Sequence, residues 1–255
     1  MLLGESGVYP PSVFCHINVI LYYIRLNNLP YGSVLKSVFL DLQDNLFSNN
    51  NWCINVNSLA NEYGLNINDF PYDNETKKYI KSVVKEKFVS EWRIKMDVRP
   101  GLKLYKMFKH EFRCEPYLQN VKNTNFRKMF TRLRTSSHFL EIERGRYVNK
   151  SECDRLCALC NTVENEFHFV MVCPLYDDLR CNLFHEIIAL FPFISLYSVY
   201  EQFLFLMGFE DSKLHYIFSK FIANAFNVRS GVVLTLPAAD DLCQSLDAGG
   251  CQSHT

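Results

Sequence analysis

Apolar residues recur at helical spacing along most of the chain, and short polar or proline-containing breaks separate the periodic segments. In the segment 12–26, Val13, Ile17 and Ile20 fall on one face of a helix. In the segment 34–47, the same spacing groups Leu35, Val38, Phe39 and Leu42. Further segments with this pattern are 56–63, 74–96, 164–172, 175–191, 199–207 and 213–226. These patterns predict a mostly α-helical protein.

The segment after Asn125 combines the clearest apolar face with dense positive charge. The positions i, i+3, i+4 and i+7 are occupied by Phe126, Met129, Phe130 and Leu133, which is typical of a helix. The remaining surface of this helix carries Arg127, Lys128, Arg132 and Arg134. We predict that these cations contact nucleic-acid phosphates, because a guanidinium can hold a phosphate through two parallel hydrogen bonds.

Three segments are less regular. The segment 102–112 fits either a strand or a helix, and the segment 140–147 alternates between apolar and polar residues and bends at Gly145. After Asn227 the periodicity ends. The final stretch is rich in small and polar residues, so we predict a disordered C-terminal tail at 228–255.

The charges of this 255-residue chain are segregated although they sum to zero. Residues 76–150 hold 20 of the 27 Lys and Arg residues and 7 of the 27 Asp and Glu residues, a net charge of +13, and the remainder carries −13. Such a block suits a polyanion, and Arg144 and Arg146 beside Gly145 add to it. For the stretch 77–87 alone, a solvated helix face is the simpler explanation.

The sequence contains no apolar run near the roughly 18 residues that a membrane helix needs. Residues 1–9 lack the basic start and long apolar centre of a signal peptide. We therefore expect an intracellular protein, nuclear or cytoplasmic, with no membrane partner. In that reducing environment ten cysteines are poor candidates for disulfides, and clustered ones indicate a metal.

The strongest chemical signal is the spacing Cys157-x2-Cys160-x7-His168-x4-Cys173. Structural zinc sites use four thiolate and imidazole ligands, and two cysteines separated by two residues can face one ion from a tight turn. We predict that these four residues bind one Zn²⁺. Because the protein would fill every coordination position, the site would be structural and not catalytic.

Two alternatives to this ligand set remain open. The four residues could be small buried core residues, since free cysteine is often buried. Other nearby residues could replace a ligand or form a hydrogen bond to one, and these are Cys153, Cys181 and His185.

A resemblance to a known family rests on five strings: FRKMFTRLRTSSH at 126–138, LEIERGRY at 140–147, LCALC at 156–160, EFHF at 166–169 and CPLY at 173–176. Together they resemble the C-terminal region of non-LTR (LINE-type) retrotransposon polyproteins, which follows the reverse transcriptase. Residues 4–10 and 16–20 are similar to the linker after the polymerase thumb. The resemblance covers roughly residues 4–226. It implies a cysteine–histidine zinc knuckle at Cys157, Cys160, His168 and Cys173, in a region that helps to bind template RNA or target DNA.

The polymerase signature of that family is not matched. It consists of an aromatic residue, a spacer and two aspartates that hold metal ions for phosphoryl transfer. The string Tyr176-Asp177-Asp178 lacks the spacer, and we interpret both aspartates as exposed helix residues. No endonuclease sequence and no glycine-rich phosphate loop are recognisable, and the residues after Asn227 do not resemble the family. We expect a non-catalytic fragment without a small-molecule substrate, whereas the full-length family protein is an RNA-directed DNA polymerase.

These observations predict helical segments around a small CCHC zinc knuckle. We expect an N-terminal helical region at 1–100, a basic helical region at 101–150, the zinc knuckle at 151–185, C-terminal helices at 186–227 and the tail. The expected function is binding of RNA, DNA or both. Phe139 and Tyr147 could stack on unpaired bases, although burial is the simpler expectation. The alternatives are a zinc-stabilised protein-interaction module and a functionless element remnant.

Overall fold

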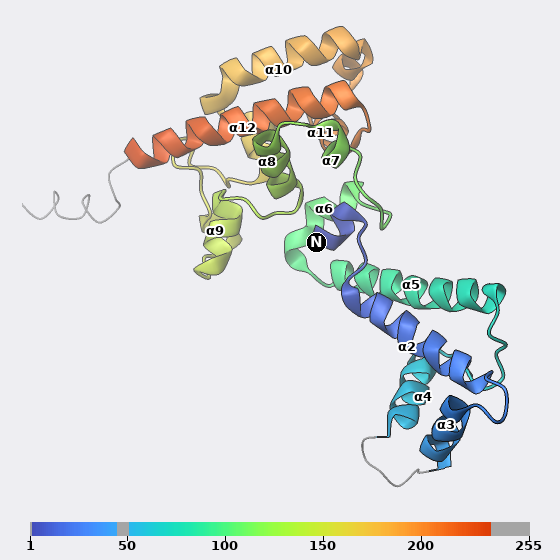
Figure 1. The fold of residues 1–255 in the computed structure, drawn as a ribbon. Helices are drawn as coiled ribbons and strands as arrows, with labels where there is room; N and C mark the ends of the chain where they lie inside the picture. The colour runs from blue at the N-terminus through green and yellow to red at the C-terminus, as the bar shows by residue number, and fades with distance from the viewer. Residues whose placement is uncertain (1, 45–50, 236–255) are drawn as a thin grey trace, which may run out of the picture. The chain divides into compact units, whose positions relative to one another are not determined.

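A computed structural model describes residues 2–44 and 51–235 and shows a mostly α-helical protein (Figure 1). Within those residues there is no β-strand, and the only β-type pairings are two isolated bridges. The predicted fold class is therefore confirmed. Most of the predicted disordered tail, residues 236–255, lies outside the described part of the chain.

The chain divides into two compact units. The first contains Met1–Pro100 and Glu111–Cys114, and the second contains Gly101–His110 and Glu115–Thr255. Apart from Glu111–Cys114, the segments expected separately at 101–150, 151–185 and 186–227 share one unit. None of the helices in the described residues is long and apolar enough to cross a membrane.

The first unit is built from α1 (Leu2–Ser6), α2 (Pro11–Asn27), α3 (Val34–Asp44), α4 (Trp52–Glu62) and α5 (Asn74–Asp97). The central helix α2 contacts α3, α4 and α5 and buries the face that its periodicity predicted. Asp73 begins α5 by accepting a hydrogen bond from the Thr76 backbone, which satisfies one of the free N–H groups of a helix start. The lysines of α5 lie mainly on its solvated side, and Lys78 pairs there with Glu75.

Helix α3 does not bury the face that its sequence predicts. Phe39 is buried, but Leu35, Val38 and Leu42 are exposed. Lys36 is buried instead, and its Nζ donates a hydrogen bond to the Asn27 carbonyl at 2.7 Å. The polar end of this lysine is satisfied by a backbone carbonyl, so the helix can turn Lys36 and Phe39 inward together.

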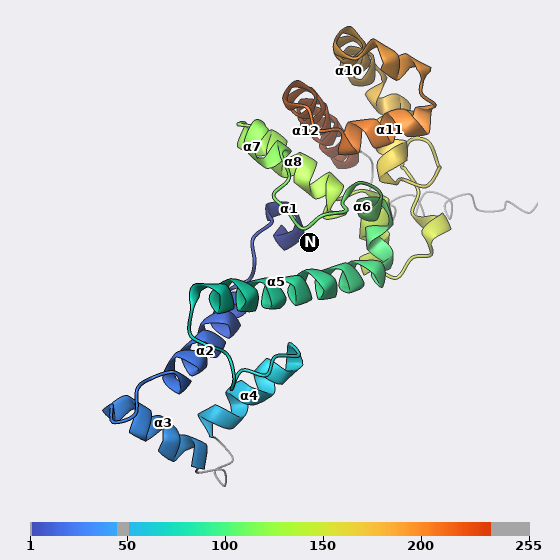
Figure 2. The same ribbon diagram turned by 90° about the vertical axis from the view of Figure 1, so that its right-hand side faces the viewer.

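The second unit contains α6 (Lys103–Phe108), α7 (Tyr117–Asn120), α8 (Thr124–Arg134), α9 (Glu141–Tyr147), α10 (Asp177–Leu190), α11 (Val199–Gly208) and α12 (Ser212–Thr235), with the short turns η2 (Glu152–Asp154), η3 (His168–Val172), η4 (Pro174–Tyr176) and η5 (Pro192–Leu196). Helix α12 packs between α8 and α10 (Figure 2). Its apolar side chains, among them Leu214, Phe218 and Ile222, form the centre of the core.

Two segments of the second unit differ from their prediction. Residues 141–147 form the helix α9, and the missing Cβ of Gly145 leaves room for the Arg155 side chain on the helix. Helix α12 continues past residue 227 to Thr235, so it extends beyond the point at which the tail was predicted to begin. Arg229 is buried in that extension and forms an ion pair with Glu164.

Candidate metal centre

The structure brings the four predicted ligands together. Ligand atoms of Cys157, Cys160, His168 and Cys173 all lie within 4.8 Å of one another. The Sγ atom of Cys173 is 3.6 Å from that of Cys160 and 4.0 Å from that of Cys157. Cys160 is half-buried, whereas the other three residues are buried. This cluster could hold a metal ion.

A tight turn orients the first two sulfur atoms. The Asn161 backbone N–H donates to the Cys157 carbonyl at 3.0 Å, and the Cys157 N–H donates to the Thr162 carbonyl at 2.7 Å. Asn161 adopts a left-handed conformation with φ of 52°, which asparagine tolerates better than most residues. An antiparallel bridge between Leu156 and Val163 closes the turn. Both cysteines of the turn consequently face the same point.

The other two ligands depend on a π-helical turn. Residues His168–Val172 form this turn, and the Cys173 N–H donates to the His168 carbonyl at 2.8 Å. This i→i+5 hydrogen bond places His168 and Cys173 one turn apart on the same side of the chain. The sequence predicted an ordinary helix over 164–172, and in such a helix residues five apart would point in different directions.

The His168 ring is prepared for a ligand at Nε2. Its Nδ1 lies 3.3 Å from the Thr162 hydroxyl, while Nε2 is buried without a hydrogen-bond partner. A metal-bound histidine commonly donates its second N–H to such an oxygen, which fixes its orientation. With Nδ1 as the donor, the Nε2 lone pair is left for an ion, and the donor set of three thiols and one imidazole fits a metal.

Burial governs the protonation of these ligands. It raises the pKa of Cys173 to about 12 and also raises the pKa of Cys160, and it lowers the pKa of His168. Without a cation the thiols of Cys160 and Cys173 therefore hold their protons at neutral pH. A metal ion must displace these protons, so its affinity should fall as the pH falls.

The metal loop, defined as residues 157–173, is anchored by Glu164. Its carboxylate accepts two hydrogen bonds of 2.7 Å from Arg229 on α12 and one from the Glu141 backbone at the start of α9. Its carbonyl accepts a further hydrogen bond from the Ile142 N–H. One glutamate between the ligands thus joins the metal loop to α9 and α12.

Glu166, two residues further along the loop, forms a second anchor. Its Oε1 lies 2.9 Å from His138 Nε2 and accepts a hydrogen bond from the Ser136 hydroxyl at 3.1 Å. Although desolvation opposes it, hydrogen bonding and charge from His138 hold the pKa of Glu166 below its usual value. The Ser136 hydroxyl and the His138 ring both point to this carboxylate, so the group has a structural role and is not a nucleophile with its base.

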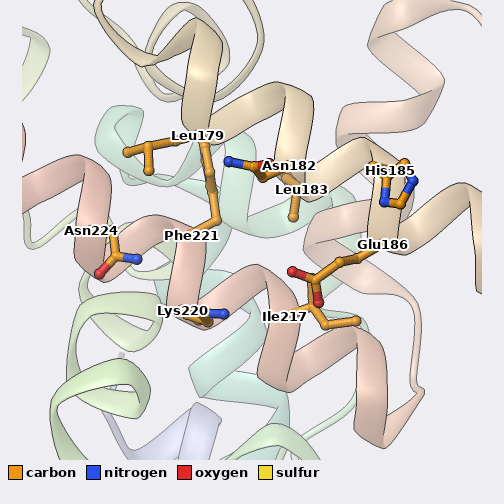
Figure 3. A pocket seen from close by; sticks show the side chains of 9 residues that line it. All are labelled: Leu179, Asn182, Leu183, His185, Glu186, Ile217, Lys220, Phe221 and Asn224. Atoms are coloured by element: carbon orange, nitrogen blue, oxygen red, sulfur yellow. The ribbon is translucent and has the colours of Figure 1, made fainter.

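The other candidate ligands are not in the cluster. Cys153 and Cys181 are exposed, and Cys153 lies 2.8 Å from the Ser151 hydroxyl. His185 lines a surface groove between α10 and α12, together with Glu186 and other residues of the two helices (Figure 3). The cluster therefore consists of the four residues that the sequence predicted first.

The residues predicted to bind nucleic acid have different environments. Arg134 is only 2% exposed, and its guanidinium pairs with Glu115 at 2.7 Å and lies over the Phe108 ring. It cannot contact a phosphate, contrary to the sequence prediction. The buried face of α8 includes Arg134 in addition to the four predicted hydrophobic positions. Glu115 compensates the charge of the buried Arg134.

The remaining cations are more accessible. Arg127 is half-buried and donates to the backbone carbonyls of Leu118 and Val121, whereas Lys128 is exposed. Arg132 lies over the ring of Phe139 at 5.3 Å. Two further cations are exposed on α9 and form ion pairs one turn back along the helix, Arg144 with Glu141 and Arg146 with Glu143.

Two aromatic residues that were expected to be buried are exposed. Phe139 is 57% exposed and Tyr147 is 84% exposed. Asp177 and Asp178 occupy the first turn of α10 and are exposed, as interpreted from the sequence. Comparison with protein-family models, with curated proteins and with solved structures found no match to this chain.

Proposed function

We propose that the chain is a zinc-stabilised, non-catalytic module that binds RNA, DNA or both. Zinc is the metal that three thiolates and an imidazole favour. Zn–S bonds of about 2.3 Å in a tetrahedron separate the sulfur atoms by about 3.8 Å. The two sulfur separations of 3.6 and 4.0 Å lie on either side of that value. The role of the ion would be structural, because four protein ligands leave no position for water.

The observation that carries the nucleic-acid proposal is the hydrogen bonding between the metal loop and α9. Glu164 holds the first turn of α9 through the backbone of Glu141 and Ile142. The α9 end, defined as Arg144, Arg146, Tyr147, Val148 and Lys150, is exposed. The metal loop therefore holds in place the helix whose end carries three cations and an exposed aromatic ring.

This composition fits a single-stranded nucleic acid. Phosphates bind cations by releasing counterions, which gives salt-dependent affinity with little sequence preference. Tyr147 offers a ring on which a base can stack, and Phe139 with Arg132 above it offers a second. The two rings are not among the cations predicted to contact nucleic acid. Because rings stack on unpaired bases, they favour a single strand over a duplex.

We further propose that the chain corresponds to the post-polymerase region of a non-LTR retrotransposon polyprotein. The motif strings at 126–176 support this, and the metal cluster lies at the positions of the knuckle that the resemblance implies. In that context the module would contact template RNA or target DNA, and the polymerase activity would belong to a longer protein.

The test is binding of the zinc-loaded chain to fluorescent single-stranded RNA and to duplex DNA across a salt series. We expect affinity that falls steeply with salt. The triple variant Arg144→Gln/Arg146→Gln/Lys150→Gln should reduce the slope of log K against log salt by about 2 for a single strand. A matched variant, Lys78→Gln/Lys81→Gln/Lys95→Gln on the solvated face of α5, should leave most of the affinity in place.

The metal requirement is tested with Cys157→Ser/Cys160→Ser, which should lose both zinc and nucleic-acid binding. Folded, zinc-loaded protein that does not bind either nucleic acid at low salt would exclude this function. If the α5 variant weakened binding as much as the α9 variant, the positive charge of the chain in general, and not the α9 end, would be responsible for nucleic-acid binding.

A further inference from the structure

The second unit exposes an unusual group of apolar side chains between α10 and α11. Exposed here are Phe193, Leu196, Tyr197, Val199 and Tyr200, which we call the aromatic patch. Leu196 is 85% exposed. The rings of Phe193 and Tyr197 lie 5.9 Å apart and both pack on Phe205, so these two side chains are contiguous, and the other three lie within three residues of Tyr197 in the sequence. Soluble monomers rarely expose contiguous apolar surface of this kind outside an interaction site.

The charge around the aromatic patch restricts what can cover it. Between Cys181 and Ser212 there is no lysine or arginine, and the acidic residues are Glu186, Glu201, Glu210 and Asp211. Helix α6, which contacts α11, adds Lys103 and Lys106, so the negative charges still outnumber the positive ones. This balance disfavours nucleic acid and anionic lipid. A complementary surface must be apolar and basic.

The same unit carries a surface with those properties. The α9 end combines Arg144, Arg146 and Lys150 with Tyr147 and Val148, which are 84% and 66% exposed. Figure 1 shows α9 and α11 at different places in the unit, so the two surfaces are separate within one chain. The net charge of zero also leaves no overall repulsion between copies.

We propose that the aromatic patch docks the α9 end of a second copy of this chain. Because each copy carries both surfaces, two copies can make the contact twice about a two-fold axis, with each contact pairing different residues of the two chains. Tyr147 and Val148 would cover the patch, and the three cations would face its acidic surroundings. This inference rests on the α9 end of the proposed function, and nucleic acid and a second copy would compete for it.

Sedimentation velocity of the zinc-loaded full chain without nucleic acid, over protein concentrations from about 1 to about 200 µM, tests the contact. We expect a reversible monomer–dimer equilibrium. Leu196→Asp in the patch and Tyr147→Asp in the α9 end should each weaken the dimer at least tenfold, because both side chains are exposed in the monomer and neither supports its core. Ile94→Asp, an exposed apolar position on α5, should not.

Mixing the two variants gives the sharpest result. Leu196→Asp keeps the α9 end and Tyr147→Asp keeps the patch, so one of the two contacts is intact in a mixed dimer and mixing should restore part of the association. A wild-type chain that stays monomeric would overturn the proposal. Loss of the dimer in Leu196→Asp but not in Tyr147→Asp, without rescue on mixing, would mean that the patch meets itself and would overturn it equally.

The outcome is separable from the test of nucleic-acid binding. At protein concentrations where the wild type is monomeric, Leu196→Asp should bind RNA with wild-type affinity, because the patch is remote from α9. A chain that dimerises as described but binds no nucleic acid would keep this inference and lose the proposed function.

Discussion

At the scale of single residues, the metal centre depends on groups beyond its four ligands. Thr162 is the clearest case, because its hydroxyl is the hydrogen-bond partner of His168 Nδ1. The sequence marks cysteine and histidine ligands by type and spacing. It gives no comparable signal for Thr162, since threonine is common in turns and its role depends on the ring that the fold brings to it.

We predict that Thr162→Val lowers zinc affinity by about 10- to 100-fold while all four ligands remain. The lost oxygen would leave the imidazole without the acceptor that fixes its orientation. Competition with a chromophoric chelator measures the change. Thr124→Val, at an exposed threonine at the start of α8, is the matched control, and equal losses in the two variants would contradict the role given to Thr162.

His215 makes stability dependent on pH. It is buried beside Tyr117 and Phe130 and accepts a hydrogen bond from Asn120. Burial, followed by the charge of Arg134, lowers the pKa of His215 below its usual value of 6.5. The unfolded chain then binds a proton at a higher pH than the folded chain does. The contribution of His215 is complete above pH 6.5 and is lost as the pH falls below that value.

We therefore expect the free energy of unfolding of the zinc-saturated protein to fall between pH 7 and pH 5.5, and to fall less steeply in His215→Gln. Urea denaturation at a series of pH values measures both slopes. The exposed His110→Gln is the control, and its slope should match that of the wild type. Parallel slopes for His215→Gln and the wild type would count against this assignment.

At the scale of elements, the sequence predicted most helices because their apolar periodicity and their burial agree, as in α2 and α12. It failed at α3, where burial of Lys36 reverses the expected face. The sequence also did not predict the π-helical turn at His168. This turn is only five residues long, which is too short for its different periodicity to be recognised in the pattern of apolar residues. The prediction for Arg134 was wrong for a third reason. An arginine on a basic helix is expected to be exposed, and its buried partner Glu115 is identified only by the structure.

Helices α9 and α12 should respond to the metal together, because Glu164 in the metal loop binds both. We predict that a chelator increases amide hydrogen exchange in the first turn of α9 and in the segment of α12 around Arg229. Exchange in the centre of α2, which belongs to the other unit, should not change. Mass spectrometry resolves these segments, and unchanged exchange around Arg229 would contradict the coupling.

At the scale of the whole molecule, the two units should differ in their dependence on zinc. All four ligands lie in the second unit, and the core of the first is formed by α2 to α5. Free zinc at 100 times its dissociation constant should stabilise the second unit by about 2.7 kcal/mol.

Calorimetry with and without chelator should consequently show one transition that moves and one that does not. Cys157→Ser, measured under both conditions, should show two transitions, neither of which moves. A single transition that shifts as a whole would instead mean that the units unfold together.

The unequal burial of the three sulfur atoms has a kinetic consequence. Cys157 and Cys173 are enclosed, while Cys160 is half-exposed beside Leu159, which is itself 55% exposed. A bound ion would be most accessible beside Cys160, so we expect an incoming chelator to approach there and to displace the Cys160 thiolate first. A bulkier side chain in place of Leu159 would then slow the entry and the release of a metal ion alike, so we expect slower exchange with little change in affinity.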